Sequence, residues 1–174
     1  MILLDEVLAR AKTLSGVRSV TLTNALPQNV QAPTDTFRIA GELGDVALPV
    51  PRAVSLRVDP GYLETMGVPL QQGRFFEETD RAGQPLVAVI NQTMVDKRFE
   101  RMSPLGQLIL IGGESREIVG VVADVSQTIV QVSGGSCETV YVPIAQMPLV
   151  STYLMLATTG DAGQLHRADQ DSAQ

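Results

Sequence analysis

Apolar positions change their spacing along this chain, and each spacing predicts one kind of element. Near the N-terminus they recur three and four residues apart, which predicts an amphipathic helix over residues 2–14. Further on, short apolar runs bounded by turn residues are typical of strands. The expected strands cover residues 17–24, 36–40, 53–58, 86–90, 107–111, 117–125, 139–142 and 153–157. Many strands interleaved with few helices indicate an α+β fold rather than a doubly wound parallel sheet.

The stretch 58–91 holds a second predicted helix, and the other elements are organised around this stretch. Asp59 suits the N-cap, Pro60 suits the first helical position, and Gly67 suits the C-terminal stop. These residues predict a short helix over residues 60–66.

Two further signals lie after this helix. Gly73 is expected to bend the chain so that Phe75 and Phe76 can pack together. Asn91 follows a continuous apolar run and is expected to cap a third helix over residues 92–99.

Alternation also predicts which side chains of the strand 53–58 are buried. Val54, Leu56 and Val58 are expected to face the core, because they recur every second residue. Ser55 and Arg57 alternate with them and are expected to face solvent.

Five sequence words carry a resemblance to a known family. They are VDPGYLETMGVPLQQGRFF, DRAGQPLVAVINQTMVDKRF, SPLGQLI, REIVGVVADV and TVYVPIAQ. In this order, the words resemble the extracytoplasmic core domain of the MacB-like ABC-transporter permeases, which are relatives of the FtsX-type permeases. The resemblance covers residues 3–165. No single word is a catalytic signature, so the specificity lies in the ordered set.

The resemblance implies a two-lobed domain over residues 1–165 with a mixed β-sheet and flanking helices. One βαβ-type lobe would comprise residues 1–87 and 123–165, and a smaller, mostly β lobe would be inserted at residues 88–122. Residues 166–174 form a polar tail that we expect to be disordered.

The same resemblance implies a function that is conformational rather than chemical. In such permeases the domain lies outside the cytoplasmic membrane between two transmembrane helices. Motions driven by an ABC ATPase reach it through those helices, and it moves against a periplasmic adaptor, a regulated protein or cargo. The lobes would shift as stiff bodies, with Gly73, Gly106 and Gly120 as candidate pivots and Phe75 and Phe76 as the packing anchor.

Composition excludes several other classes. The 174 residues carry a formal net charge of -6 with scattered Lys and Arg, which argues against a nucleic-acid partner. One histidine, His166, and one cysteine, Cys137, are too few for a thiolate or histidine metal site. No cofactor motif is present, so the sequence predicts a domain that is not an enzyme.

Acidic residues and one arginine leave alternatives open. Glu77, Glu78 and Asp80 could form an all-oxygen site, but a solvated loop is the simpler interpretation. Arg74 could bind an anion, although it is expected to tie a neighbouring loop through backbone carbonyls.

The alternative function is a small-molecule or peptide-binding module. In that interpretation a cleft between the lobes, near Arg74, Phe75 and Tyr141, would hold the ligand.

Two expectations concern the membrane and the ends of the chain. The uncharged window 139–160 contains Pro143 and Pro148, so two strands are expected there rather than a membrane span, and the chain itself should be soluble. In the family resembled, a helix and a further strand follow near residue 165. We therefore expect this chain to be a fragment with an unpaired sheet edge that pairs with another copy in a homodimer.

Overall fold

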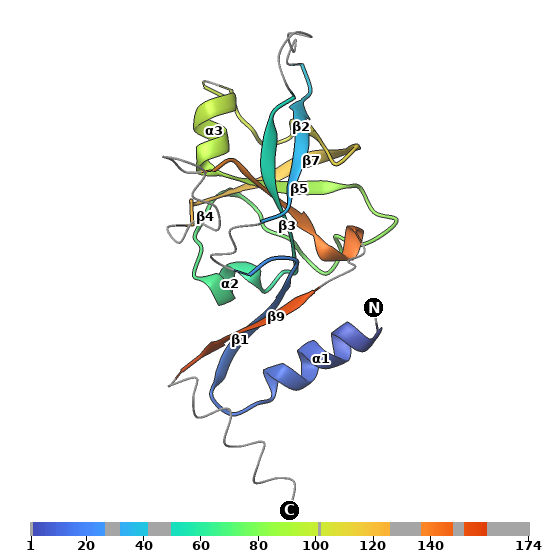
Figure 1. The fold of residues 1–174 in the computed structure, drawn as a ribbon, viewed down its shortest axis with the longest axis vertical. Coiled ribbons are helices and arrows are strands. Elements are labelled where there is room, and N and C mark those ends of the chain that lie inside the picture. Colours follow the sequence, from blue (N-terminus) through green and yellow to red (C-terminus); the bar gives the residue numbers. More distant parts are fainter. Residues whose placement is uncertain are drawn as a thin grey trace, which may run out of the picture.

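The computed structural model describes residues 2–26, 32–41, 50–100, 102–125, 137–147 and 152–159 (Figure 1). Its helices are α1 (Ile2–Lys12), α2 (Tyr62–Met66) and α3 (Gln92–Arg98), with a 3-10 turn at Ile144–Gln146. Its strands are β1 (Val17–Thr23), β2 (Thr34–Ile39), β3 (Arg52–Val58), β4 (Leu70–Gly73), β5 (Val87–Asn91), β6 (Leu108–Ile111), β7 (Glu114–Val122), β8 (Thr139–Pro143) and β9 (Tyr153–Thr158). Each predicted strand and helix therefore has a counterpart, and the fold is a β-rich mixed domain with few short helices. The predicted tail 166–174, with His166, lies outside the described residues.

Six of the strands form a closed ring, in the order β3, β8, β5, β7, β6, β2. The β3–β8 and β5–β7 pairs are parallel, and the others are antiparallel. Strand β2 closes the ring because its first half pairs with β3, at Thr34↔Val54, and its second half pairs with β6, at Phe37↔Ile111. We call these six strands the barrel.

Strands β1 and β9 form a two-stranded extension that we call the ribbon. They pair antiparallel from Val17↔Thr158 to Thr23↔Tyr153. In Figure 1 the ribbon crosses below the barrel, with α2 on its upper side and α1 on its lower side. Strand β1 also pairs with β3, at the single register position Thr23↔Val58, so the ribbon joins the barrel at one corner.

Two apolar clusters fill the domain, one on each face of the central strands. Alternate residues of β5 belong to different clusters: Ala88 and Ile90 pack with Met94 and Phe99 of the α3 region, whereas Val87 and Val89 pack on the other side. All five residues of β5 and of β8 are buried for this reason. A strand that is covered on both faces needs a continuous apolar run, which is what the sequence has there.

The predicted exposure of Ser55 is wrong. Ser55 is 2% exposed, although Val54, Leu56 and Val58 are buried as expected. It alternates with them and lies on the same face of β3 as Ala53, which packs in the cluster with Ile90 and Ile109. The prediction from alternation assumed that one face of the sheet is exposed to solvent. Closure of the barrel buries that face.

The strands predicted to form an inserted lobe, within residues 88–122, pair here with strands outside that range. Strand β7 pairs with β4, β5 pairs with β8, and β6 pairs with β2. The division at residues 88 and 122 into two lobes stays a prediction, and the barrel and ribbon are the units that the strand pairing defines.

Gly73 and Gly120 face each other where β4 pairs with β7. A Cβ on Gly73 would lie 2.2 Å from the Val119 carbonyl oxygen, and a Cβ on Gly120 would lie 2.1 Å from the Arg74 carbonyl oxygen. The bend predicted at Gly73 is present, with a φ of 68°. Both glycines are therefore required by the close approach of two backbones.

We predict that Gly120→Ala lowers the free energy of unfolding by about 3 kcal/mol or more, because a backbone oxygen cannot move aside as a side chain can. Gly106→Ala is the matched control, since a Cβ there has no atom within 4 Å. Gly106 has a φ of 80°, so its replacement should cost only about 1 kcal/mol of conformational strain. Urea unfolding of both variants measures the difference, and equal losses would contradict the steric explanation.

Candidate functional site

The corner between ribbon and barrel is held by the backbone and side chain of Asn24. Its amide nitrogen Nδ2 donates to the Ser55 carbonyl at 3.3 Å, and its Oδ1 accepts from the Arg57 N–H at 2.9 Å. Its backbone N–H also donates to the Arg57 carbonyl at 3.2 Å. One residue at the end of β1 thus continues the pairing with β3 after the last strand residue.

Asp59, the residue that follows β3, makes a further contact with β1 at this corner. It is 7% exposed, and its carboxylate accepts a short hydrogen bond from the Thr21 hydroxyl of β1. The predicted N-cap role of Asp59 is wrong: α2 begins at Tyr62, Gly61 is its N-cap residue, and no side chain caps it. Burial raises the pKa of Asp59 and outweighs the Thr21 hydrogen bond, which lowers it.

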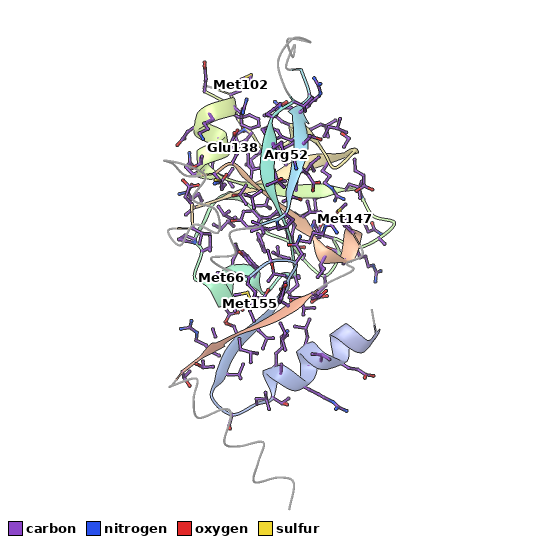
Figure 2. The ribbon with its side chains drawn as sticks, viewed as in Figure 1. Arg52, Met66, Met102, Glu138, Met147 and Met155 are labelled. Carbon is purple, nitrogen blue, oxygen red and sulfur yellow. The ribbon has the colours of Figure 1, made fainter. Side chains whose placement is uncertain are left out.

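Gly61 lets α2 approach the ribbon closely. A Cβ at this position would lie 2.6 Å from the Val20 carbonyl oxygen of β1. The helix ends as predicted at Gly67, which has a φ of 65°. Tyr62 of α2 is buried, and Leu63 and Met66 pack partly buried on the same cluster. Helix α2, which carries Met66, also contacts β9, which carries Met155 (Figure 2).

Arg74 and Asp80 clamp the loop that follows β4. The guanidinium donates to both Asp80 oxygens, at 2.7 and 3.0 Å, and to the Phe75 carbonyl at 3.1 Å. Asp80 also accepts from the Glu77 N–H at 2.9 Å. Hydrogen bonding to Arg74 holds the pKa of Asp80 below its usual range, and the same bond raises the pKa of Arg74.

This clamp refines two expectations from the sequence. Arg74 does tie a neighbouring loop, but mainly through a carboxylate and not only through a carbonyl. Asp80 is 6% exposed, so the expectation that it only solvates the loop is wrong. Phe75 and Phe76 stack beside the clamp with their ring centroids 4.5 Å apart. A bidentate arginine already occupied in this way leaves less of its donor set for a ligand.

Tyr141 lies in the core rather than on a cleft wall. It is 1% exposed, and its ring centroid is 5.7 Å from that of Tyr62. Burial raises the pKa of Tyr141 well above its usual range, and it raises that of Tyr62 to about 12. Both rings therefore contribute packing at every ordinary pH.

Asn91 joins three elements beyond its predicted cap. Its Oδ1 accepts from the Met94 N–H at 3.2 Å, which confirms the cap, and from the Thr139 N–H at 2.9 Å. Its Nδ2 donates to Asp124 at 2.6 Å and to the Cys137 carbonyl at 2.9 Å. All four hydrogen-bonding positions of this buried amide are used, so α3, β5 and β8 are fixed relative to one another.

Arg116 is buried inside the barrel at 1% exposure. It donates to Gln146 at 3.0 Å and to Glu114 at 2.5 Å. Gln146 in turn accepts from the Val87 N–H and donates to the Pro85 carbonyl. A buried charge needs such partners, and this network attaches the 3-10 turn to the end of β5.

Groups of three or more potential metal ligands do not occur among the described residues. Within the same residues, no helix has the length and apolar character needed to cross a membrane. The uncharged window 139–160 contains β8 and β9, as the proline positions predicted. The polar contacts described above hold elements together.

Comparison with known proteins decides the family. The model of the MacB-like periplasmic core domain matches residues 4–168. This chain belongs to that family. The match covers nearly the whole chain and confirms the family that the five sequence words resemble.

Curated relatives of this MacB-like domain are parts of ABC transporters. The uncharacterized ABC transporter permease YknZ of Bacillus subtilis is 32% identical over 69 residues, which are 40% of this chain and 17% of YknZ. The pyoverdine export ATP-binding/permease protein PvdT of Pseudomonas entomophila is 45% identical over 56 residues, which are 32% of this chain and 9% of PvdT. The matched stretches thus span less than a fifth of these relatives.

Solved structures share the fold. The periplasmic region of MacB from Actinobacillus actinomycetemcomitans has a TM-score of 0.62 at 17% identity and covers 97% of this chain and 73% of its own. The extracellular domain of the ABC-type transporter YknZ has a TM-score of 0.59 at 22% identity and covers 94% and 76%. The likeness to these two structures is a likeness of fold.

We predict that Asp59→Asn makes stability less dependent on pH. The raised pKa of Asp59 means that its contribution to stability is full below the unfolded pKa, about 4, and is lost as pH rises through the folded pKa. The variant should therefore gain stability relative to the natural chain between pH 4 and pH 7. Glu64→Gln, an exposed acid on α2, is the control and should show no such gain. Urea unfolding at both pH values measures it, and parallel pH profiles would contradict the role given to burial.

Removing the Arg74–Asp80 clamp should lower the free energy of unfolding more than removing a neighbouring exposed acid does. Asp80→Ala removes two bonds from Arg74 and one from Glu77, so we expect it to lower the free energy of unfolding by about 1 to 2 kcal/mol. Glu78→Ala, at an exposed position two residues away, should change it by less than about 0.5 kcal/mol. Thermal unfolding of the two variants distinguishes them, and similar effects would show that the clamp adds no stability.

Proposed function

We propose that this domain is a non-catalytic transmission and interaction domain of an ABC permease. Conformational changes driven by the ATPase would reach it through the permease's transmembrane helices. The domain would then move against partner proteins or cargo outside the membrane. The observation that carries the proposal is the family match over residues 4–168 together with a fold of two units joined at one corner.

The joint between the units supports a mechanical role. Ribbon and barrel share one strand pair, Thr23↔Val58, which is reinforced by the bonds of Asn24 and by the Thr21–Asp59 bond. A single reinforced corner passes a displacement of α1 and β1 to the barrel without unfolding either unit. It also permits rotation, because few backbone hydrogen bonds cross it.

The candidate pivots differ in the space around them. Gly106 has no atom within 4 Å of a Cβ position, whereas Gly73 and Gly120 are held against backbone oxygens. Gly106 is therefore the better pivot of the three, and Phe75 and Phe76 remain the proposed packing anchor beside Gly73.

Partners are proposed by analogy with the relatives. An ABC ATPase fits, because the relatives include ATP-binding/permease proteins such as PvdT. A periplasmic adaptor or a regulated protein would contact the outer surface of the barrel. The ligand-binding alternative has weaker support, since Tyr141 is buried and Arg74 is bound to Asp80.

The encoding gene gives the first test. We expect its reading frame to encode apolar segments of about 20 residues on both sides of this chain, long enough to span a bilayer. Sequence without such segments on either side would contradict the permease proposal.

Distances in the parent permease test the transmission mechanism. Spin labels at Arg10→Cys on α1 and Asp96→Cys on α3 measure the distance between the ribbon side and the barrel side of the domain. Cys137→Ser removes the natural cysteine, so that only these two positions are labelled. ATP with vanadate should change this distance, whereas a pair at Asp96→Cys and Arg38→Cys on β2, both on the barrel side, should keep its distance. The three labelled positions, Arg10, Asp96 and Arg38, are exposed. An unchanged ribbon-to-barrel distance at full ATP hydrolysis would contradict transmission between the two units.

A further inference from the structure

Polar groups line the contact between β1 and residues 59–66, the segment that contains α2. The Thr21 hydroxyl donates to the Asp59 carboxylate across this contact. Gly61 lies so close to β1 that a Cβ there would be 2.6 Å from the Val20 carbonyl oxygen. Helix α2 also contacts β1, and it lies beside the ribbon in Figure 1. We call the contact of β1 with residues 59–66 the seam.

Two hydroxyl groups in the seam are buried and have no hydrogen-bond partner within the described part of the chain. They are Ser19 Oγ of β1 and Thr65 Oγ1 of α2. Ser19 lies on the same face of β1 as Thr21, and Thr65 follows Gly61 by one helical turn. A buried hydroxyl without a partner costs free energy, and it regains hydrogen bonds when water reaches it. The closed seam therefore leaves hydrogen bonds unmade that water would supply once the seam opens.

Asp59 adds a buried carboxyl group whose hydrogen-bond partners are all neutral. It is 7% exposed, and none of the ion pairs of the described residues includes it. Burial of a carboxyl group without a cationic partner disfavours the ionised form. Burial accordingly raises the pKa of Asp59, and the hydrogen bonds from Thr21 and from the backbone at Leu22 and Gly61 do not offset it.

The charged side chains on the elements around Asp59 leave this balance unchanged. Lys12, at the end of α1, lowers the pKa of Asp59, but it is the weakest of the influences on that group and is itself exposed. The other charges on these elements are Arg18 on β1, Arg57 on β3 and Glu64 on α2, and none of them shifts the pKa of Asp59. Strand β9 carries no charged residue. Access of water to the carboxyl group therefore governs its protonation.

We propose that the seam opens locally and that opening is coupled to the loss of one proton from Asp59. Separation of β1 from residues 59–66 exposes the carboxyl group to water, where an aspartic acid ionises at about pH 4. While the seam is closed, ionisation requires a higher pH. Between these two pH values the opening constant rises with pH, by at most about tenfold per pH unit, because one proton is released. Below and above this range it is constant.

This coupling makes the surrounding pH a control on the ribbon. An acidic medium keeps β1 attached to residues 59–66, and a neutral medium lets the two separate more readily. The consequence for transport rests on the proposed function, whereas the opening is a property of the domain alone. Experiments on this chain therefore test the seam separately from the permease role.

Thiol labelling measures the opening. In a Cys137→Ser background, Ser19→Cys places a thiol on the buried face of β1, where the natural residue is 8% exposed and its hydroxyl has no protein partner to lose among the described residues. The labelling rate with a dipyridyl disulfide, divided by the rate of a short cysteine peptide at the same pH, gives the opening constant. We expect this constant to rise by at least about threefold from pH 4 to pH 7.

Three variants control the measurement. Asp59→Asn cannot ionise but can still accept from Thr21, so labelling at Ser19→Cys should lose its pH dependence in that background. Glu64→Gln, which removes an exposed acid of α2, should leave the pH dependence unchanged. Ser55→Cys, at a position 2% exposed inside the barrel, should be labelled more slowly than Ser19→Cys at every pH. Circular dichroism should show that all variants are folded.

NMR of the natural chain gives a second test that needs no variant. The chemical shift of the Asp59 carboxyl carbon, followed against pH, should change at a higher pH than that of an exposed aspartate, which titrates at about pH 4. Titration at or below that pH would overturn the proposal. An opening constant that does not depend on pH, or the same pH dependence in Asp59→Asn as in the natural chain, would overturn it as well.

Discussion

Burial of the central strands on both faces is the constraint on which the rest of this structure depends. Because β5 and β8 are wholly buried, every backbone and side-chain group along them needs a partner inside the protein. The closed ring of six strands provides the backbone partners. Asn91, Gln146 and Arg116 provide the side-chain partners at the strand ends. The barrel is thereby fixed at both ends of its innermost strands.

The ribbon is different because the same constraint acts on only one of its strands: β1 is buried on both faces from Ser19 to Thr23, whereas the residues of β9 are exposed or half-buried. Of the side chains described on α1, that of Ala11 is buried, and β9 is covered poorly. Its connection to the barrel depends on Thr23, Asn24, the Thr21–Asp59 bond and the packing of α2 against both units. The proposed function requires that the barrel and the ribbon shift relative to each other while each keeps its own structure.

The sequence was enough to predict elements whose signals are local. The turn at Gly67, the cap at Asn91 and the apolar run of β5 depend on neighbours a few residues away, and all are confirmed. The exposure of Ser55 was predicted wrongly because the barrel closes through a long-range pairing of β2 with β3, which alternation within one strand cannot reveal. The role of Asp59 was predicted wrongly for a similar reason, because its hydrogen-bond partner, Thr21, is 38 residues away in the sequence. The burial of Arg116 was not predicted, because an arginine within a strand gives no local sign that it will be buried.

Native-state hydrogen exchange tests most directly the claim that the barrel and the ribbon are separate units. Amides of β5 and β8 should exchange only through global unfolding, with the full free energy of unfolding. Amides of α1 should exchange through a smaller opening, with a distinctly lower free energy and a weaker dependence on denaturant. If α1 and β5 instead exchanged with the same free energy and the same denaturant dependence, the chain would be one cooperative unit, and transmission through a mobile corner would be contradicted.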